Sequence, residues 1–321
     1  MTAAAGPPAL LCTNFILERY GDRVAAAAPH LQPIALNDGD VLDEADLARL
    51  RVAFFSADAW PDQAAHFMGA VVRAPALDWL HTFSVGTDHP VFTDLLDRGV
   101  RVSTSSGASA GPIARTVMLY LLALSRDLPR LVRAQAAHEW APRSYDDLEG
   151  RTVGVVGMGP IGLEVIRMSG ALGMRTIGMR RAVVGDEPCT TWTLDRLPEL
   201  ASIADALVIA LPLTDDTRGL ISAEVISRMR PDAIFINVGR GELVDEPALT
   251  AALADGRLGG AGLDVFATEP LPSDSTLWDL PNVLVTPHMS GTCPTSDERA
   301  VEIFLANLSA FARDEQLLNE R

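Results

Sequence analysis

Three segments in the second half of the chain carry residue types that bind anions and transfer protons. Arg240 lies within residues 237–245, Glu269 within 262–270 and His288 within 286–291. An arginine presents a planar fork of donors that suits a carboxylate and polarises an adjacent carbonyl. An imidazole can protonate a forming alkoxide near neutral pH, and an ionised carboxylate beside it orients the ring. The three side chains together suit the binding of a carboxylate and the transfer of a proton to a neighbouring oxygen.

Each of these segments follows an apolar run that is typical of a strand. The runs are Ala233–Val238, Gly260–Asp264 and Val283–Thr286. Ligands of an open parallel sheet bind outside the carboxyl ends of its strands. We therefore expect Arg240, Glu269 and His288 to converge on one ligand.

A glycine-rich loop between a predicted strand and a predicted helix indicates a dinucleotide site. The strand Arg151–Val156 leads into a GxGxxG sequence, and helical residues follow from Leu163. The first glycine permits a tight turn, the second admits a pyrophosphate, and the third allows close packing of helix on strand. The loop residues are Gly157, Met158, Gly159, Pro160, Ile161 and Gly162.

The end of the next predicted strand, Arg175–Met179, should select between the two nicotinamide cofactors. An acidic residue there binds a ribose 2′-hydroxyl, whereas arginine accommodates a 2′-phosphate. This sequence has Arg180 and Arg181 at that point. We expect NADP(H) to be preferred over NAD(H); the alternative is that both arginines are only solvated.

Composition excludes several classes of protein. The chain has 321 residues and a formal net charge of −16, so phosphate contacts to nucleic acid are not expected. All basic residues are arginine, which excludes lysine Schiff-base chemistry. The length suggests two domains.

The N-terminal residues and the cysteines lead us to expect a cytoplasmic protein. Cys12, Cys189 and Cys293 form no metal-binding spacing, and their sparse, odd number fits a reducing compartment. Residues 1–8 lack the basic start of a signal peptide. The longest apolar run, Val117 to Leu124, is too short to span a membrane. We therefore expect a cytoplasmic protein with no metal and no membrane partner.

Strand-like and helix-like stretches alternate along the chain, which predicts parallel sheets covered by helices. One α/β unit ends near Ser103, and a long helix over 110–138 connects it to a second unit. The strands expected in the first unit are Leu10–Thr13, Arg51–Ser56, Trp79–Ser84 and Val100–Ser103, and its helices lie near 19–28, 44–50, 62–73 and 92–97. Further strands of the second unit are expected at Arg175–Met179 and Ala206–Ala210, and a last helix at Ser296 to Leu318.

These motifs together resemble the D-isomer-specific 2-hydroxyacid dehydrogenase family, most strongly over residues 150–291. The resemblance implies an α/β fold of two doubly wound parallel-sheet domains with a cleft that closes. A Rossmann dinucleotide-binding domain, residues 104–290, is then inserted into a flavodoxin-like substrate domain, residues 1–103 plus 291–321. It also implies that Arg240, Glu269 and His288 are catalytic, and that the protein is a homodimer through the nucleotide domain.

The resemblance extends to further binding residues. It places Asp264 near the nicotinamide amide, and Leu211, Pro212 and Thr217 near the adenosine. The other cofactor contacts that it implies are Val238, Gly239, Arg240, His288, Ser290 and Gly291. It assigns the substrate carboxylate to Arg240 and to the backbone of Ser84, Val85 and Gly86. The sequence departs from the family at Ser84, where glycine is more frequent, and at Arg115, where glutamate often stands.

The expected reaction is reduction of a small 2-oxo acid, such as glyoxylate or hydroxypyruvate, by NADPH to the D-2-hydroxy acid. One alternative is an NAD-dependent dehydrogenase for a bulkier 2-oxo acid. Another is a non-catalytic, nucleotide-sensing corepressor-like dimer, since this fold also serves as an interaction module. The presence of Arg240, Glu269 and His288 favours an enzyme.

Overall fold

The chain folds into two compact units, each built on one parallel sheet. The computed structural model describes residues 6–37, 39–145 and 147–321. The first unit comprises Met1–Ala108 and Cys293–Arg321, and the second comprises Ser109–Thr292. Residues 1–5, on which the expectation of no signal peptide partly rests, lie outside the described residues.

The first unit has a five-stranded sheet in the order β2-β1-β3-β4-β5, with all neighbours parallel. This is the doubly wound order of flavodoxin-like folds. Its strands are β1 Ala9–Thr13, β2 Gln32–Leu36, β3 Leu50–Phe55, β4 Trp79–Thr82 and β5 Arg101–Thr104. Its helices are α1 Asn14–Ala27, α2 Glu44–Arg49, α3 Ala64–Arg73, α4 Pro90–Asp97 and α11 Pro294–Ala312.

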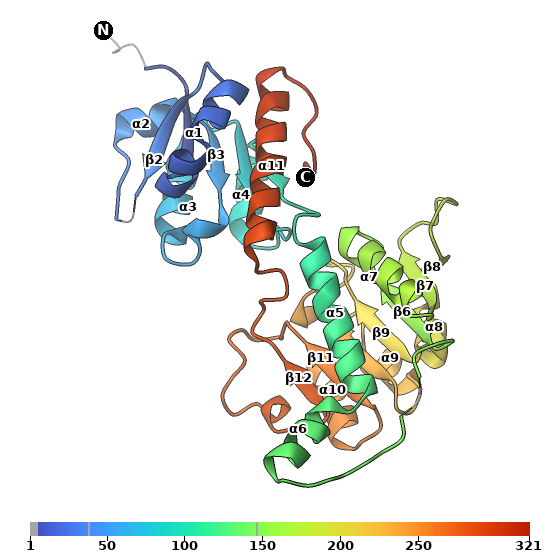
Figure 1. Ribbon diagram of the computed structural model, residues 1–321. Coiled ribbons are helices and arrows are strands. Elements are labelled where there is room, and N and C mark those ends of the chain that lie inside the picture. The colour runs from blue at the N-terminus through green and yellow to red at the C-terminus, as the bar shows by residue number, and fades with distance from the viewer. Residues whose placement is uncertain (1–5, 38, 146) are drawn as a thin grey trace. The chain divides into compact units, whose positions relative to one another are not determined.

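Local sequence explains how this unit is assembled. Strand β1, an interior strand of the sheet, is buried throughout, as expected for a continuous apolar run in a parallel sheet. It ends at Thr13, whose hydroxyl accepts the N–H of Ile16 and caps α1. The last helix, α11, pairs with α1 through ion pairs from Arg19 to Glu298 and from Arg23 to Glu302. The end of the chain thus returns to the first unit (Figure 1).

A buried polar network crosses this unit at β4 and β5. His81 is fully buried; its Nδ1 lies 2.7 Å from Ser103 Oγ and its Nε2 lies 3.1 Å from Ser105 Oγ. Trp79 Nε1 also donates to Ser103 Oγ, at 2.8 Å. Burial lowers the pKa of His81 to about 3, because an apolar surrounding disfavours the charged ring.

The second unit has a seven-stranded parallel sheet in the order β12-β11-β10-β9-β6-β7-β8. Counted from β6, this is the Rossmann order with one strand added beyond β11. Its strands are β6 Thr152–Val156, β7 Arg175–Arg180, β8 Thr190–Thr193, β9 Ala206–Ile209, β10 Ile234–Asn237, β11 Gly260–Leu263 and β12 Val283–Val285. Its helices are α5 Ala110–Ser125, α6 Leu128–Ala136, α7 Pro160–Ala171, α8 Leu197–Ile203, α9 Ala223–Arg228 and α10 Glu246–Ala254.

The expected fold class is confirmed, but several elements differ from the prediction. The helix expected at Ser296 to Leu318 is α11, which begins at Pro294 and already ends at Ala312. The strands β2 and β8 were not predicted; both lie at sheet edges, where few side chains are buried. The single helix expected over 110–138 is wrong. The chain breaks at Asp127, whose φ of +51° is left-handed, and α6 begins with Leu128 and Pro129. Within the described ranges, no helix is both long and apolar enough to cross a membrane.

Candidate active site

The glycine loop between β6 and α7 has the geometry that a pyrophosphate requires. Gly157 has a φ of +107°, and a Cβ there would lie 2.6 Å from the carbonyl oxygen of Ala210. A Cβ on Gly162 would lie 1.8 Å from the carbonyl oxygen of Gly157, so only glycine permits this packing. A Cβ on Gly159 would meet nothing within 4 Å. The backbone at the start of α7 is therefore open, and the loop fits a dinucleotide.

Arg180 and Arg181 lie at the carboxyl end of β7, where the sequence placed them. Arg180 Nη1 is 3.4 Å from Oε1 of Glu187, whose side chain is only 6% exposed. Glu187 also accepts the N–H groups of Val184 at 2.6 Å and Gly185 at 2.8 Å. These N–H groups, with Arg180, hold the pKa of Glu187 below its usual range. Arg180 thus has an acidic partner that the sequence reasoning missed.

Arg181 has a different environment. Its Nη2 is 3.4 Å from Asp216 Oδ2, and both side chains are 82% exposed. Such an exposed ion pair contributes little to the stability of the fold, and it leaves the arginine able to turn toward another anion.

The loop after β9 holds the residues expected near the adenosine. Leu211 packs at the edge of the core of the second unit. The Thr217 hydroxyl donates to the carbonyl oxygen of Pro212 at 2.8 Å and accepts the N–H of Thr214 at 2.8 Å. Thr217 therefore fixes the shape of this loop.

The loop that carries Arg240 is fixed from below by Asn237, the last residue of β10. Asn237 is buried; its Nδ2 donates to the carbonyl oxygen of Arg240 at 2.9 Å, and its Oδ1 accepts the N–H of Gly239 at 3.0 Å. Gly239 also permits a close approach, because a Cβ there would lie 2.8 Å from the carbonyl oxygen of Leu211. Arg240 Nη1 donates to the carbonyl oxygen of Gly239 at 2.9 Å. Val238 beside it is buried.

Gly241 brings the Arg240 loop against the loop after β11. A Cβ on Gly241 would lie 1.8 Å from the carbonyl carbon of Phe266. No side chain fits there, so the two backbones are in direct contact. Phe266 is in turn bonded to Glu269, since its N–H donates to Glu269 Oε1 at 3.0 Å. The loops of Arg240 and Glu269 are therefore held together by backbone packing.

Glu269 and His288 form a hydrogen-bonded pair. His288 Nδ1 is 2.7 Å from Glu269 Oε2, and the side chains are 47% and 35% exposed. An ionised carboxylate only accepts, so Nδ1 carries the proton in this pair and Nε2 is left for exchange with a ligand. The backbone of His288 is left-handed, with a φ of +49°.

The loop of His288 is held by Asp264, at the end of β11. Asp264 is 1% exposed, and its carboxylate accepts the N–H groups of Met289 at 2.9 Å and Ser290 at 3.0 Å, together with the hydroxyl of Thr286. The N–H of His288 donates to the carbonyl oxygen of Asp264 at 2.8 Å. Asp264 therefore fixes the direction in which His288 leaves the sheet.

Tyr120 on α5 completes this support. Its hydroxyl bonds to that of Thr286, and burial raises the pKa of Tyr120 to about 12. The ring lies against β11 because Gly262 leaves room: a Cβ on Gly262 would lie 2.3 Å from Tyr120 Cγ. Gly291, at the end of the same loop, lies against Ser109 and Ile113 at the start of α5.

The structure thus gathers Arg240, Glu269 and His288 at the ends of β10, β11 and β12, which are neighbours in the sheet. Sequence reasoning missed the residues that hold them, namely Asn237, Gly241, Thr286 and Tyr120. The glycines and the polar residues at strand ends were the available signals, but their partners lie far along the chain.

The predicted substrate loop lies in the first unit, after β4. Ser84 Oγ donates to the carbonyl oxygen of Gly86 at 3.0 Å and lies 3.0 Å from Thr82 Oγ1. A glycine at position 84 could make neither contact. The departure from the family at Ser84 therefore adds a bond across the turn.

Arg115, the other departure, lies on α5. Its guanidinium covers Gly111, at 3.4 Å from the position of a Cβ there. It also helps Arg167 to lower the pKa of Glu164 on α7.

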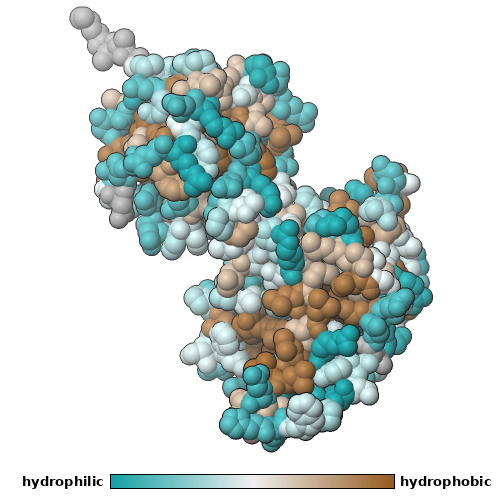
Figure 2. Space-filling model, in the orientation of Figure 1, coloured by the Kyte–Doolittle hydropathy of each residue, from teal (hydrophilic) through white to brown (hydrophobic). Residues whose placement is uncertain are grey.

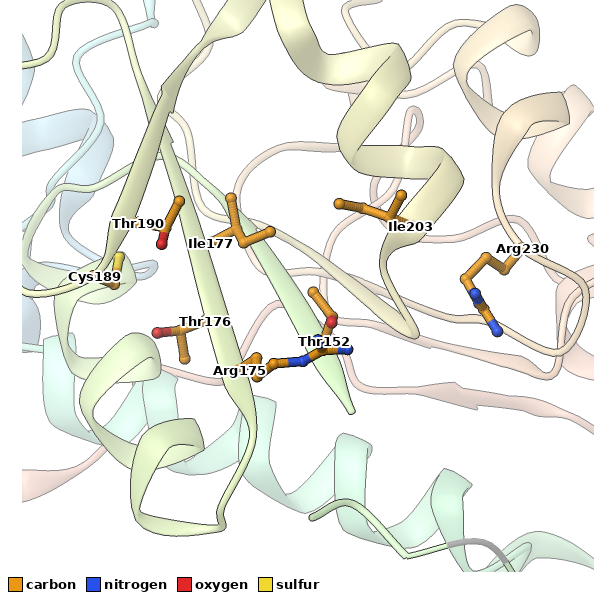
Figure 3. Close-up of a pocket in the computed structure, with 8 residues that line it drawn as sticks. All are labelled: Thr152, Arg175, Thr176, Ile177, Cys189, Thr190, Ile203 and Arg230. Carbon is orange, nitrogen blue, oxygen red and sulfur yellow. The ribbon is translucent and has the colours of Figure 1, made fainter. Parts of the chain in front are cut away.

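A surface cavity of about 620 Å³ lies at the amino ends of the strands of the second sheet, away from the strand ends that carry Arg240, Glu269 and His288 (Figure 3). It lies beside the first residues of β6, β7 and β8. Its lining residues are Thr152, Arg175, Thr176, Ile177, Cys189, Thr190, Ile203 and Arg230. None of the predicted site residues contributes to it.

Comparison with known proteins places the chain in a family. Residues 118–290 match the D-isomer specific 2-hydroxyacid dehydrogenase, NAD binding domain. The chain is 38% identical over 254 residues to glyoxylate/hydroxypyruvate reductase B of Pectobacterium carotovorum, covering 75% of this chain and 79% of that protein. It is 36% identical over 249 residues to hydroxyphenylpyruvate reductase of Plectranthus scutellarioides, covering 76% and 78%.

A solved structure is similar over nearly the full length. It is the NADPH-dependent glyoxylate/hydroxypyruvate reductase of Sinorhizobium meliloti in complex with NADP and sulfate, with a TM-score of 0.80, 30% identity and 98% of each chain covered. The two doubly wound sheets and these matches define an NAD(P)-dependent dehydrogenase. The chain belongs to the D-isomer specific 2-hydroxyacid dehydrogenase family, which confirms the resemblance seen in the sequence.

Proposed function

We propose that this enzyme reduces a small 2-oxo acid, glyoxylate or hydroxypyruvate, to the D-2-hydroxy acid with NADPH. The observation that carries the proposal is the hydrogen-bonded pair of Glu269 and His288, in which Oε2 lies 2.7 Å from Nδ1. The two residues follow β11 and β12, and Arg240 follows β10, which is the neighbour of β11 in the sheet. The similarity to the Pectobacterium and Sinorhizobium reductases supports this choice of substrates.

In this proposal His288 is the general acid. The bound dihydronicotinamide supplies the hydride, and Nε2 of His288 gives a proton to the substrate's carbonyl oxygen as that oxygen becomes an alkoxide. Proton transfer from a positioned side chain contributes about 10²–10⁴ in rate. Glu269 keeps the ring in the orientation that leaves Nε2 toward the substrate, and its charge stabilises the imidazolium before the transfer.

Arg240 and the loop after β4 are proposed to bind the carboxylate. The guanidinium of Arg240 also polarises the neighbouring carbonyl. The first unit contributes backbone N–H groups of the loop 84–86, of which that of Ser84 already donates to Thr82 Oγ1 at 3.3 Å. Such successive amides form concave sites for anions.

The cofactor is proposed to bind along the carboxyl edge of the second sheet. The open backbone at Gly159 would hold the pyrophosphate, with Met158, Pro160 and Ile161 around it. Leu211, Pro212 and Thr217 would line the adenosine, whereas Val238, Gly239, Asp264, Ser290 and Gly291 would lie around the nicotinamide. Arg180 and Arg181 would hold the 2′-phosphate of NADP(H).

One observation favours a second candidate, an NAD-dependent enzyme for a bulkier 2-oxo acid. Arg180 already pairs with Glu187, and the negative charge of this carboxylate repels a phosphate. The relative from Plectranthus is named for hydroxyphenylpyruvate, a larger 2-oxo acid. In this alternative the Glu187 ion pair holds Arg180 when NADH is bound.

We also propose that two copies associate through the second unit. Exposed apolar side chains lie on helices α5, α6 and α7, and Figure 2 shows apolar surface over α5 and its surroundings. A contiguous apolar surface of this kind is typical of an interface. The residues on these helices are Leu119, Leu122, Leu128, Val132 and Leu163, and Leu172 directly follows α7.

The experiment that tests the function is a panel of 2-oxo acids, each assayed with NADPH and with NADH. The proposal expects the highest kcat/KM for glyoxylate or hydroxypyruvate with NADPH. Highest activity with an aromatic 2-oxo acid and NADH would favour the second candidate. Turnover of none of these substrates would contradict both.

A further inference from the structure

The last residues of the chain run along the edge strand of the first sheet. The N–H of Thr104 donates to the carbonyl oxygen of Asn319 at 3.2 Å, and the N–H of Arg321 donates to that of Val102 at 2.9 Å. The bridge between Ser103 and Glu320 is antiparallel. Residues 319–321 therefore pair with β5 as a short added strand.

Side chains hold this segment as well. Asn319 Nδ2 donates to the carbonyl oxygens of Thr104 at 3.2 Å and Ser106 at 3.0 Å. Glu320 receives two bonds from Arg101, at 2.6 Å and 2.9 Å, and Arg101 lowers the pKa of Glu320. The backbone of Arg321 is consequently fixed beside the loop that follows β4.

Arg321 reaches that loop directly. Its Nη2 donates to the carbonyl oxygen of Val85 at 3.1 Å. Val85 is the middle residue of the loop 84–86, to which we have assigned the substrate carboxylate. The guanidinium therefore lies on the carbonyl side of the Val85–Gly86 peptide.

The other carbonyls of the loop are also bonded. Ser84's carbonyl oxygen accepts the N–H of Ser105 at 3.3 Å, and that of Gly86 accepts the Ser84 hydroxyl at 3.0 Å. Three successive carbonyls, of residues 84, 85 and 86, thus each have a donor.

A trans peptide points its N–H away from its carbonyl, so the three donors also direct the N–H groups of Val85, Gly86 and Thr87. Among the residues that the structure describes, none accepts a hydrogen bond from these N–H groups. A hydrogen bond to the carbonyl of a peptide also polarises its N–H and strengthens the bond that this N–H can donate.

We infer that Arg321 is a positioning residue for the substrate carboxylate, acting through the carbonyl oxygen of Val85. It orients the Val85–Gly86 peptide, strengthens Gly86 N–H as a donor and adds positive charge behind the loop. This inference rests on the proposed function, because it takes the ligand of the loop to be the carboxylate of a 2-oxo acid.

The test compares Arg321→Met, which keeps an unbranched apolar side chain without the donors or the charge, with Arg321→Lys, which keeps the charge. For Arg321→Met we expect KM for the 2-oxo acid to rise about tenfold, because the net effect of one hydrogen bond to a charged group is of that size. Its kcat and its KM for NADPH should stay within about twofold. Arg321→Lys should recover part of the loss. Arg313→Met is the matched control, since Arg313 is exposed and pairs only with Glu315 within the described chain.

A second measurement does not depend on turnover. Oxalate, an unreactive carboxylate, is titrated into the enzyme with bound NADP⁺ by calorimetry. Its Kd should weaken in Arg321→Met by the same factor as KM. If the wild type reduces 2-oxo acids but Arg321→Met changes neither KM nor the Kd of oxalate, the inference is overturned and the proposed function stands. A lower Tm with unchanged KM would overturn it too, whereas a wild type that reduces no 2-oxo acid would overturn both the inference and the proposed function.

Discussion

Glu269 binds His288 with one carboxylate oxygen and the backbone of its own loop with the other. Oε2 lies 2.7 Å from His288 Nδ1, and Oε1 accepts the N–H of Phe266 at 3.0 Å. The carboxylate is therefore held by the loop and is not free to follow the imidazole. This geometry fixes the ring by means of the backbone, and it makes the pair sensitive to changes in either loop.

Replacing Glu269 with glutamine should remove the charge of this pair and one of its two acceptors. The single amide oxygen can accept from His288 Nδ1 or from the N–H of Phe266 but not from both, and it no longer stabilises the imidazolium. We expect kcat to fall by about 10²-fold, within the range of general acid catalysis, with a much smaller change in KM for NADPH. Steady-state kinetics measure the effect, and Glu224→Gln on the surface of α9 is the control. Equal kcat in Glu269→Gln and wild type would contradict the assigned role.

Gly241 provides a test of how the Arg240 loop is positioned. In Gly241→Ala the new Cβ would overlap Phe266, so the loops of Arg240 and Glu269 must separate. We expect kcat/KM to fall more than about tenfold and stability to fall by about 1–3 kcal/mol, as in overpacked cores. Gly170→Ala in α7 is the control, because its Cβ would meet nothing within 4 Å. That control should be neutral or more stable. Full activity in Gly241→Ala would show that the close approach is unnecessary.

The two ends of β7 offer a matched pair of variants for the cofactor. Arg180→Asp places a carboxylate where a 2′-phosphate is proposed to bind, and it should lower the NADPH/NADH ratio of kcat/KM at least about tenfold. Arg175→Asp changes the same charge at the first residue of the strand and should leave the ratio unchanged. A ratio that is unchanged in Arg180→Asp would support the NAD-dependent alternative.

His81 should make the first unit sensitive to acid. Its pKa is lowered from 6.5 to about 3 in the folded protein, so the unfolded chain binds the proton more readily between these values. Stability contributed by the neutral ring is present above pH 6.5 and is lost as the pH falls toward 3. Between pH 7 and pH 5 this group should lower the free energy of unfolding by about 2 kcal/mol. Chemical denaturation at both pH values measures it. In His81→Gln the difference between the two pH values should be smaller by that amount; an equal difference would contradict the shift.

Much of the fold could be predicted because buried parallel strands are continuous apolar runs, as in β1 and β6. The strands that sequence reasoning missed, β2 and β8, lie at the sheet edges and mix polar with apolar residues. The break between α5 and α6 had a signal in Pro129, but the apolar period continues on both sides of it.

In the candidate site, too, some residues could be predicted from the sequence and others could not. Arg240, Glu269 and His288 could be predicted because each follows a strand within a short motif. The residues that support them could not, because Tyr120 and Thr286 meet only after α5 packs on β11. Arg321 and Val85 likewise stand 236 positions apart and are joined only by the pairing of the last residues with β5.

The central claim is that His288 donates the proton in the reduction of a 2-oxo acid. It is tested most directly by measuring kcat for glyoxylate and hydroxypyruvate with NADPH in the wild type and in His288→Ala, with NADPH binding measured in parallel. We expect kcat to fall about 10²–10⁴-fold in the variant while NADPH still binds. Turnover by His288→Ala at the rate of the wild type would contradict the account.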